Sequence, residues 1–153
     1  MRIAFDLDDT LIPCNVRFPL EPEPRNFIRR IMASERLRLG TPGLINRLWS
    51  AGHEVVVYTT SFRGSVYTKL LFRAYGTQVG QVINVPVHQR KIRTLGERYK
   101  MCTKYPPAFK IDLLIDNCGG IAIESQRYEF EMLQVDPRDE HWLDQIDEYL
   151  GLN

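Results

Sequence analysis

Short apolar runs alternate with stretches of helical spacing along this chain. Five runs have the length and residue types of buried strands: residues 3–5, 54–61 (EVVVYTTS), 81–85 (QVINV), 111–116 (IDLLID) and 131–135 (EMLQV). Runs that lack a regular polar alternation are typical of strands covered on both faces, as in a parallel sheet. The pattern therefore predicts five buried strands.

The stretches between the first three strands carry helix signals. Thr41 is a favourable N-cap residue, Pro42 suits the first helical position, and Gly52 can end the helix. The apolar face of this helix contains Leu44, Ile45, Leu48 and Trp49. A second helix is predicted to end at Gly76, and its apolar face contains Phe62, Val66, Tyr67, Leu70 and Leu71.

The second half of the chain contains one weaker helix signal and one clear one. Residues 87–100 predict a basic helix, although Gly96 lowers the helix propensity of this stretch. The last helix is amphipathic through Trp142, Leu143, Ile146 and Leu150. Strands that alternate with helices predict an α/β fold: a Rossmann-like three-layer sandwich with a mostly parallel, five-stranded sheet and helices on both faces.

The length of 153 residues is typical of one domain, so a single domain over residues 1–153 is predicted. Residues 13–38 interrupt the alternation with four prolines and a short amphipathic stretch, RNFIRRIM. This segment is predicted to form a small insertion or flap, and at most a minimal cap. The insertion also contains four arginines that are placed to meet a substrate: Arg17, Arg25, Arg29 and Arg30.

Composition and charge are those of an ordinary soluble protein. The chain is 44% apolar and 25% charged with a formal net charge of +1, so no overall field attracts nucleic acid or an anionic membrane. Three cysteines without a CxxC pattern argue against a disulfide framework or a zinc site. Because neither a signal-peptide pattern nor a membrane-spanning apolar run is present, we expect a cytoplasmic protein.

Polar side chains follow three of the predicted strands. Asp6 and Asp8 come after the first strand, Thr59 comes after the second, and Asp116 closes the fourth. Because the carboxyl ends of parallel strands meet at one edge of a sheet, these groups are expected to converge. Crowded carboxylates repel one another, and a hard cation such as Mg²⁺, which prefers oxygen ligands, offsets that repulsion.

Several common phosphate and metal motifs are absent from the sequence. There is no GxGxxG and no GxxxxGK[ST], so a glycine-rich loop does not hold nucleotide phosphates. No cysteine is followed by an arginine six positions later, which excludes the usual thiol phosphatase signature. Leu11 stands where an EF-hand loop requires glycine. The remaining candidate chemistry is that of the carboxylates.

The residues at the strand ends suit phosphoryl transfer. Once a cation offsets their charge, Asp6 can attack phosphorus as a nucleophile, and Asp8 can protonate the leaving oxygen. Thr59 can bind a phosphoryl oxygen. A lysine near the fourth strand can neutralise charge in the transition state.

Three motifs of the chain, FDLDDTL, VVVYTTS and LLIDN, resemble the first, second and fourth motifs of the haloacid dehalogenase superfamily, in the same order. The resemblance implies that Asp6 is the nucleophile and a metal ligand. It implies that Asp8 is the general acid and base, and a metal ligand through its backbone carbonyl. It further implies that Thr59 binds phosphate, that Asp116 binds Mg²⁺, and that the sheet order is fifth, fourth, first, second, third strand.

The third motif of that superfamily is a lone lysine. Four lysines precede the fourth strand and are candidates for it: Lys91, Lys100, Lys104 and Lys110. We favour Lys104, because KYPPAFKIDLLIDN places it on a proline-stiffened approach to the sheet edge. Asn117 departs from the commoner second acid of the fourth motif, so its contribution to the metal ligands stays open.

The expected activity is Mg²⁺-dependent hydrolysis of a phosphate monoester through an aspartyl-phosphate on Asp6, with a phosphorylated small molecule as the expected substrate. Processing of phosphorylated nucleic-acid ends is an alternative, which the basic stretch HQRKIRTLGERYK favours. A phospho-ligand sensor without turnover is the non-enzymatic alternative. Because the insertion is small, the site is expected to admit a bulky substrate, or to be closed by a neighbouring subunit of a homo-oligomer.

Overall fold

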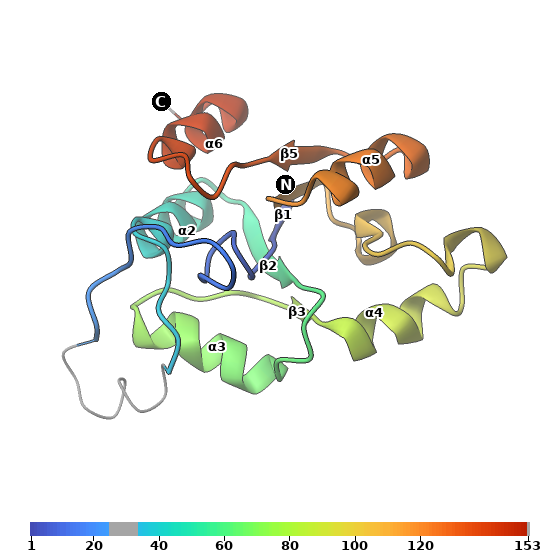
Figure 1. Cartoon of the computed structure of the whole chain (residues 1–153), viewed down its shortest axis with the longest axis horizontal. Helices are drawn as coiled ribbons and strands as arrows, with labels where there is room; N and C mark the ends of the chain where they lie inside the picture. Colours follow the sequence, from blue (N-terminus) through green and yellow to red (C-terminus); the bar gives the residue numbers. More distant parts are fainter. Residues whose placement is uncertain (25–33, 153) are drawn as a thin grey trace.

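The computed structural model describes residues 1–24 and 34–152, and its centre is a five-stranded sheet (Figure 1). The strands are β1 (Arg2–Phe5), β2 (Glu54–Tyr58), β3 (Val82–Ile83), β4 (Leu113–Asp116) and β5 (Met132–Gln134). They lie in the order β3-β2-β1-β4-β5, and each strand is parallel to its neighbours. The predicted strand order is confirmed, and β1 lies at the centre of the sheet.

Helices cover both faces of the sheet. The structure contains α2 (Thr41–Ser50), α3 (Ser65–Ala74), α4 (Val85–Ile92), α5 (Gly119–Tyr128) and α6 (Trp142–Leu150), with short 3₁₀ helices η1 (Glu97–Tyr99) and η2 (Pro106–Phe109). In Figure 1, α2, α3 and α6 lie on one side of the sheet, and α4 and α5 lie on the other. The fold is the predicted Rossmann-like three-layer α/β sandwich. None of the described helices is long and apolar enough to cross a membrane.

The central strand is apolar on both of its faces, because each face lies under helices. Ile3 and Phe5 belong to the core cluster that includes residues of α2, α3 and α6. Ala4, between them, belongs to the cluster on the opposite face, as the alternation of an extended backbone requires. All three residues are fully buried, so a one-residue shift in register would exchange side chains of different size between two packed faces, and the residue that follows β1 is held in place.

The predicted start of the first helix was wrong by one residue. Gly40 occupies the N-cap position with φ of 89°, a left-handed conformation that glycine adopts without strain, and Thr41 is the first helical residue. A side chain at position 40 would also collide with Leu143, since its Cβ would lie 2.5 Å from Cδ1 of that leucine. Close packing between the start of α2 and α6 therefore selects glycine here.

The predicted apolar face of the second helix is confirmed at Leu71 but was wrong at Phe62 and Val66. Helix α3 begins at Ser65, so Phe62 precedes it and is 78% exposed, and Val66 in its first turn is 72% exposed. The side of the helix that faces the sheet carries Leu71 and Phe72, both fully buried. The apolar residues at the start of this stretch therefore face solvent, beside the carboxyl edge of the sheet.

The basic stretch does not form one long helix. Helix α4 ends at Ile92, and between Gly96 and the end of this stretch at Lys100 the chain forms the short helix η1. Helix α5 was not predicted, because its first residues, Gly119 and Gly120, are weak helix formers and are typical of a turn after a strand.

The two described arms of the insertion pair with each other at its base. Leu20 forms an antiparallel bridge with Arg38, and the backbone N–H of Glu21 donates to the carbonyl of Leu37 at 2.8 Å. The amphipathic stretch RNFIRRIM, with Arg25, Arg29 and Arg30, lies outside the described residues, so its predicted roles stay predictions. Arg17, in the first arm, is exposed.

Candidate active site

Two carboxylates from neighbouring strands meet at the carboxyl edge of the sheet. Phe5 of β1 is paired with Ile115 of β4, and the next backbone N–H, that of Asp6, donates to the carbonyl of Ile115 at 2.9 Å. Asp116 is the last residue of β4. Asp6 is 5% exposed and Asp116 is 1% exposed, so parallel pairing at the sheet centre brings two acids together in a buried place.

The ammonium group of Lys104 joins these two carboxylates. Its Nζ lies 2.5 Å from Oδ1 of Asp6 and 2.6 Å from Oδ2 of Asp116, and the lysine is almost fully buried. Burial disfavours the cation, but the two carboxylates outweigh it and hold the pKa of Lys104 above its usual value. Burial also raises the pKa of Asp6 to about 6, against the opposing effect of Lys104. The cluster holds two anions and one cation.

The backbone on both sides of Lys104 is anchored to the sheet and to α5. The N–H of Thr103 donates to the carboxylate of Glu124 on α5 at 2.9 Å, and the Thr103 hydroxyl donates to the same carboxylate at 2.6 Å. The N–H of Tyr105 donates to the buried hydroxyl of Tyr58 at 2.9 Å. These contacts direct the lysine side chain inward, to the carboxyl ends of β1 and β4.

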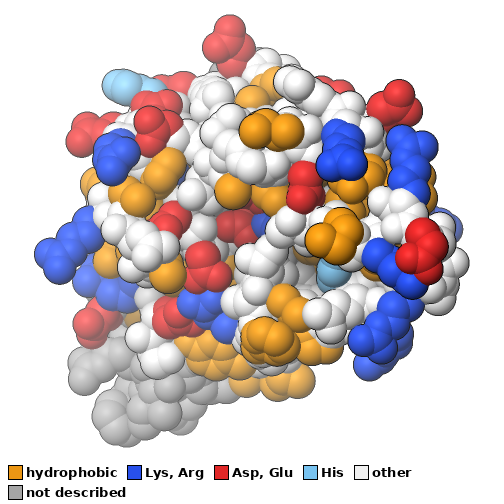
Figure 2. All heavy atoms as spheres, turned by 45° about the vertical axis from the view of Figure 1, so that its right-hand side comes forward, with side chains coloured by type: hydrophobic (Ala, Val, Ile, Leu, Met, Phe, Trp, Pro, Cys, Tyr) orange, Lys and Arg blue, Asp and Glu red, His pale blue; other side chains and the backbone are white. Residues whose placement is uncertain are grey.

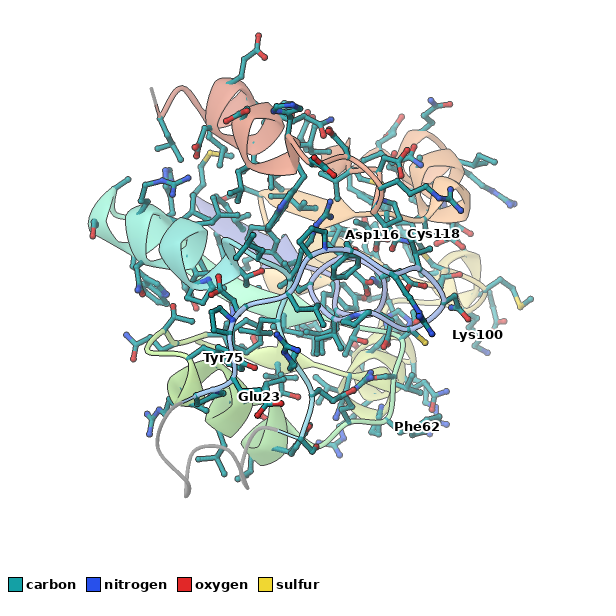
Figure 3. All side chains as sticks on the ribbon, turned by 60° about the vertical axis from the view of Figure 1, so that its left-hand side comes forward. Glu23, Phe62, Tyr75, Lys100, Asp116 and Cys118 are labelled. Carbon is teal, nitrogen blue, oxygen red and sulfur yellow. The ribbon has the colours of Figure 1, made fainter. Side chains whose placement is uncertain are left out.

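Of the four candidate lysines, the structure brings Lys104 to the carboxylates. Lys91, Lys100 and Lys110 are exposed, and Lys100 pairs with Glu97 on the surface. In Figure 3, Asp116 lies towards the middle of the molecule and Lys100 at its outer edge. The position of Lys104 matches its predicted role, while the role in catalysis stays a prediction.

Asp8 is directed away from this cluster by the turn that follows β1. The N–H groups of residues 10, 11 and 12 all donate to the carbonyl of Leu7, which closes one tight turn. The Asp8 carboxylate lies beside Arg63, whose Nη1 is 2.8 Å from Oδ1 and 2.9 Å from Oδ2, and donates to Oδ2. Oδ1 of Asp8 is buried and accepts no hydrogen bond from the described residues.

Arg63 connects Asp8 to the insertion. Its Nε and Nη2 donate to the carboxylate of Glu35, at 3.0 and 2.7 Å. Tyr67 of α3 donates to the same carboxylate at 3.0 Å. Burial opposes the ionised form of Glu35, but the hydrogen bond and charge of Arg63 prevail and hold the pKa of Glu35 below its usual value.

The hydroxyl of Thr59 is buried at the end of β2, next to the strand of Asp6. It accepts the N–H of Ser61 at 3.1 Å and lies 3.2 Å from the Ser61 hydroxyl. Thr59 and Ser61 thus form a compact hydroxyl turn at the same sheet edge as the carboxylates. Binding of phosphate by Thr59 stays a prediction.

Two polar residues link the first and fourth motifs. The hydroxyl of Thr10 lies 3.1 Å from Oδ1 of Asn117 and 3.4 Å from Oδ2 of Asp6. The remaining oxygen of Asp116 accepts the N–H of Cys118 at 2.9 Å. A hollow of about 450 Å³ opens beside Asn117 towards the loop after β5, and its lining does not include Asp6, Lys104 or Asp116.

The carboxylates at the site fit a Mg²⁺ ion that takes only a few of its ligands from the protein. The described residues contain no group of three or more acidic, histidine or cysteine side chains arranged around one point. Mg²⁺ is ordinarily held by only one or two carboxylates, with waters and substrate phosphate completing the octahedron. Asp6 and Asp116 supply two neighbouring carboxylates with lone pairs beyond those used by Lys104. The Asp8 carboxyl group lies with Arg63, so this residue's predicted contribution is its backbone carbonyl.

Asp9 holds the loop that leaves the site. Its Oδ1 accepts three backbone N–H groups, those of Cys14, Asn15 and Val16, at 2.7–2.9 Å. Asp9 has a left-handed backbone with φ of 61° and is almost fully buried. Burial alone would raise the pKa of Asp9, but these hydrogen bonds outweigh it and hold the pKa below its usual value.

Replacing Asp9 with alanine is expected to lower the free energy of unfolding by about 1–3 kcal/mol, because three donors lose their acceptor. Since the folded pKa is lowered, the stabilisation by Asp9 is complete above the unfolded pKa and is lost as the pH falls through the folded pKa. Urea unfolding at pH 7 and at pH 3–4 measures both effects, with exposed Asp144→Ala as the control. Equal stability of D9A and wild type at pH 7 would contradict this account.

The fold and the site together define an α/β sandwich with a buried Asp–Lys–Asp cluster at the carboxyl edge of its sheet. No family model and no curated protein matches the chain. Two solved structures are similar in fold, and their titles describe a Pnkp1/Rnl/Hen1 complex and a Pnkp1/Rnl/Hen1 RNA repair complex. Their chains are 15% and 14% identical to this one, with TM-scores of 0.52 and 0.51.

The likeness covers 88% of this chain in both comparisons, but 45% and 42% of the solved chains. This chain therefore spans less than half the length of the solved chains that it matches. At this level of identity, the likeness establishes the shared fold alone.

Sequence reasoning missed the residues around Asp8. Arg63 follows the second motif within a few positions, in the loop TTSFRG, and a cation so close to a predicted phosphate site was a usable signal. Glu35 gave no such signal, because its position depends on how the insertion folds back.

Proposed function

We propose that this chain is a haloacid dehalogenase-like phosphatase that hydrolyses a phosphate monoester with Mg²⁺ as cofactor. The observation that carries the proposal is the buried cluster of Asp6, Lys104 and Asp116. A cluster with excess negative charge that excludes water is costly in a purely structural role. Its placement at the carboxyl edge of a parallel sheet, where such folds bind their ligands, favours a catalytic role.

In the first chemical step, a carboxylate oxygen of Asp6 attacks phosphorus, and the bond between phosphorus and the leaving oxygen breaks. Asp8 donates a proton to that oxygen, and the product is an aspartyl-phosphate with a released alcohol. In the second step, Asp8 takes a proton from water, water attacks phosphorus, and the bond to Asp6 breaks to release inorganic phosphate.

Lys104 supports both steps by its position. Its ammonium group fixes one oxygen of Asp6, so the carboxylate is already oriented when the substrate arrives. The positive charge also offsets the negative charge that gathers near Asp6 in each transition state. The hydroxyls of Thr59 and Ser61 at the neighbouring strand end are the nearest candidates to hold phosphoryl oxygens.

Asp6 and Asp116, with the backbone carbonyl of Asp8, are the residues that would hold Mg²⁺. When bound, the ion neutralises phosphate charge and lowers the repulsion between the substrate and the carboxylates.

The proposal is tested by turnover of a generic aryl phosphate, measured with Mg²⁺ and with EDTA. We expect turnover only with Mg²⁺, and we expect Mg²⁺ at about 100 times its Kd to stabilise the fold by about 3 kcal/mol. Absence of turnover with every substrate of a broad panel of phosphorylated metabolites would favour the phospho-ligand sensor. Turnover that persists in EDTA would contradict the assigned cofactor.

A phosphorylated nucleic-acid end is a second candidate substrate, for which two observations speak. One solved structure of similar fold belongs to an RNA repair complex by its title. Besides the buried Lys104, residues 85–110 contain six exposed Lys and Arg but one acidic residue, although the whole chain has a net charge of only +1. Figure 2 shows blue side chains along the right-hand part of the face that carries this segment. Salt-sensitive binding of an end-phosphorylated oligonucleotide, followed by loss of its phosphate, would support this substrate.

A further inference from the structure

Some of the N–H groups of the Arg63 guanidinium form hydrogen bonds to carboxylates, and others remain to bind a ligand. An arginine has five N–H donors. In this structure Nε and one N–H of Nη2 are given to Glu35, and one N–H of Nη1 is given to Asp8. The other two N–H groups, one on each terminal nitrogen, have no acceptor in the part of the chain that the structure describes. The side chain is 23% exposed, so a ligand at the surface can reach part of it.

The orientation of Arg63 is fixed from several elements. Glu35 binds it side-on through two nitrogens, which is the geometry that constrains a guanidinium plane most strongly. Tyr67 of α3 holds the Glu35 carboxylate at 3.0 Å. Asn84, at the start of α4, donates to the backbone carbonyl of Arg63 at 2.9 Å. An arginine that is held in this way can bind an anion with little further loss of side-chain entropy.

In the proposed mechanism Arg63 belongs to the leaving-group side of the site, because it contacts Asp8 and not Asp6. It contacts Asp8 at 2.8 Å, and Asp8 is the residue that gives its proton to the leaving oxygen. Asp6, on the opposite side of the transferred phosphoryl group, has its own cation in Lys104. The two cations thus serve different parts of a substrate.

We propose that Arg63, positioned by Glu35, binds a second anionic group that the leaving-group part of the substrate carries. The substrate class is that of phosphate monoesters with a carboxylate or another phosphate close to the ester oxygen. This inference rests on the proposed function, since it uses Asp8 to locate the leaving group. It adds a specificity site that the Asp6 cluster does not contain.

The test uses two ligands that differ in one group. 2-Phosphoglycerate carries a carboxylate where glycerol 2-phosphate carries a hydroxymethyl group, and both have the same phosphate ester. Their affinities are measured by calorimetry with Mg²⁺ and the Asp6→Asn variant, so that binding is read without turnover. We expect 2-phosphoglycerate to bind at least about tenfold more tightly, as a charge-assisted hydrogen bond predicts.

In the Asp6→Asn background, Arg63→Met is expected to reduce this ratio to about one, because the cation is lost. Arg63→Lys keeps the charge without the planar fork and is expected to keep an intermediate ratio. Arg73→Met is the matched control, since Arg73 is an exposed arginine at the end of α3, and it should leave the ratio unchanged. A loss of affinity through misfolding weakens both ligands alike and does not move the ratio.

Equal affinities of the two ligands, no binding of either, or a ratio unchanged by both Arg63 variants would overturn the inference. These results are separate from the test of the proposed function. Turnover of an aryl phosphate by the wild type does not depend on the affinity ratio of these two ligands, because that substrate carries no second anion.

Discussion

Asparagine in place of Asp6 is expected to lower phosphatase turnover by at least about a thousandfold. The amide of asparagine cannot form the aspartyl-phosphate, so both the formation and the hydrolysis of this intermediate are lost. The side chains are nearly isosteric, so Lys104 and Asp116 keep their places and the fold is retained. Turnover of an aryl phosphate with Mg²⁺ measures the loss, and circular dichroism verifies the fold. Exposed Asp144→Asn is the matched control and should retain wild-type turnover.

The same variant is expected to lose turnover but to gain stability. Burial raises the pKa of Asp6 to about 6 from 3.8, so the folded protein binds this proton more tightly than the unfolded chain does. The resulting stabilisation is complete below the unfolded pKa and is lost as the pH rises through the folded pKa. In Mg²⁺-free buffer, D6N should therefore gain stability relative to wild type between pH 4 and pH 7. The turnover prediction has its own contradicting result: turnover of D6N within tenfold of wild type would show that Asp6 is not the nucleophile.

Methionine in place of Lys104 is expected to lower the free energy of unfolding by about 3–5 kcal/mol in Mg²⁺-free buffer, the cost of leaving buried charge without its partner. Asp6 and Asp116 are then two buried carboxylates with no cation between them. Turnover should fall together with stability. Urea unfolding at pH 7.5 measures the first effect, and aryl phosphate turnover measures the second.

The origin of that loss can be isolated with a second substitution. If repulsion between the carboxylates causes the instability of K104M, adding Asp6→Asn should restore part of the lost stability, and Mg²⁺ should restore part of it as well. Lys91→Met is the matched control, because Lys91 is exposed, and its effect should stay within about 0.5 kcal/mol. A K104M protein as stable as wild type at neutral pH would refute the charge balance described for the site.

The strands and the meeting of their ends were predictable because both follow from local patterns. Runs such as LLID are apolar without alternation, and a parallel sheet places the residues after them, Asp6 and Asp116, at one edge. Lys104 was favoured among four candidate lysines, but local patterns did not exclude the other three, since the approach that directs it inward depends on Glu124 of the unpredicted helix α5.

The surroundings of Asp8 were not predictable from local patterns. Arg63 and Glu35 are joined through space by the folding of the insertion onto the loop before α3. Net charge carries no information on local charge for a similar reason: a value of +1 averages over the basic segment 85–110 and the acidic remainder. The exposure of Phe62 had no signal either, because helical spacing alone does not determine where a helix starts.

β1 is synthesised before the other strands of the sheet, but its pairing with both neighbours cannot form until late in synthesis. Ile3 pairs with Val55 on one side and with Leu113 on the other, so the nascent polypeptide carries a bare apolar edge until β4 emerges. Contacts so distant along the chain slow folding and prolong exposure to aggregation. Truncated translation products that stop before β4 should therefore bind strongly to chaperones, and β1, β2 and β4 should come together in a single late step that also brings Asp6 and Asp116 together.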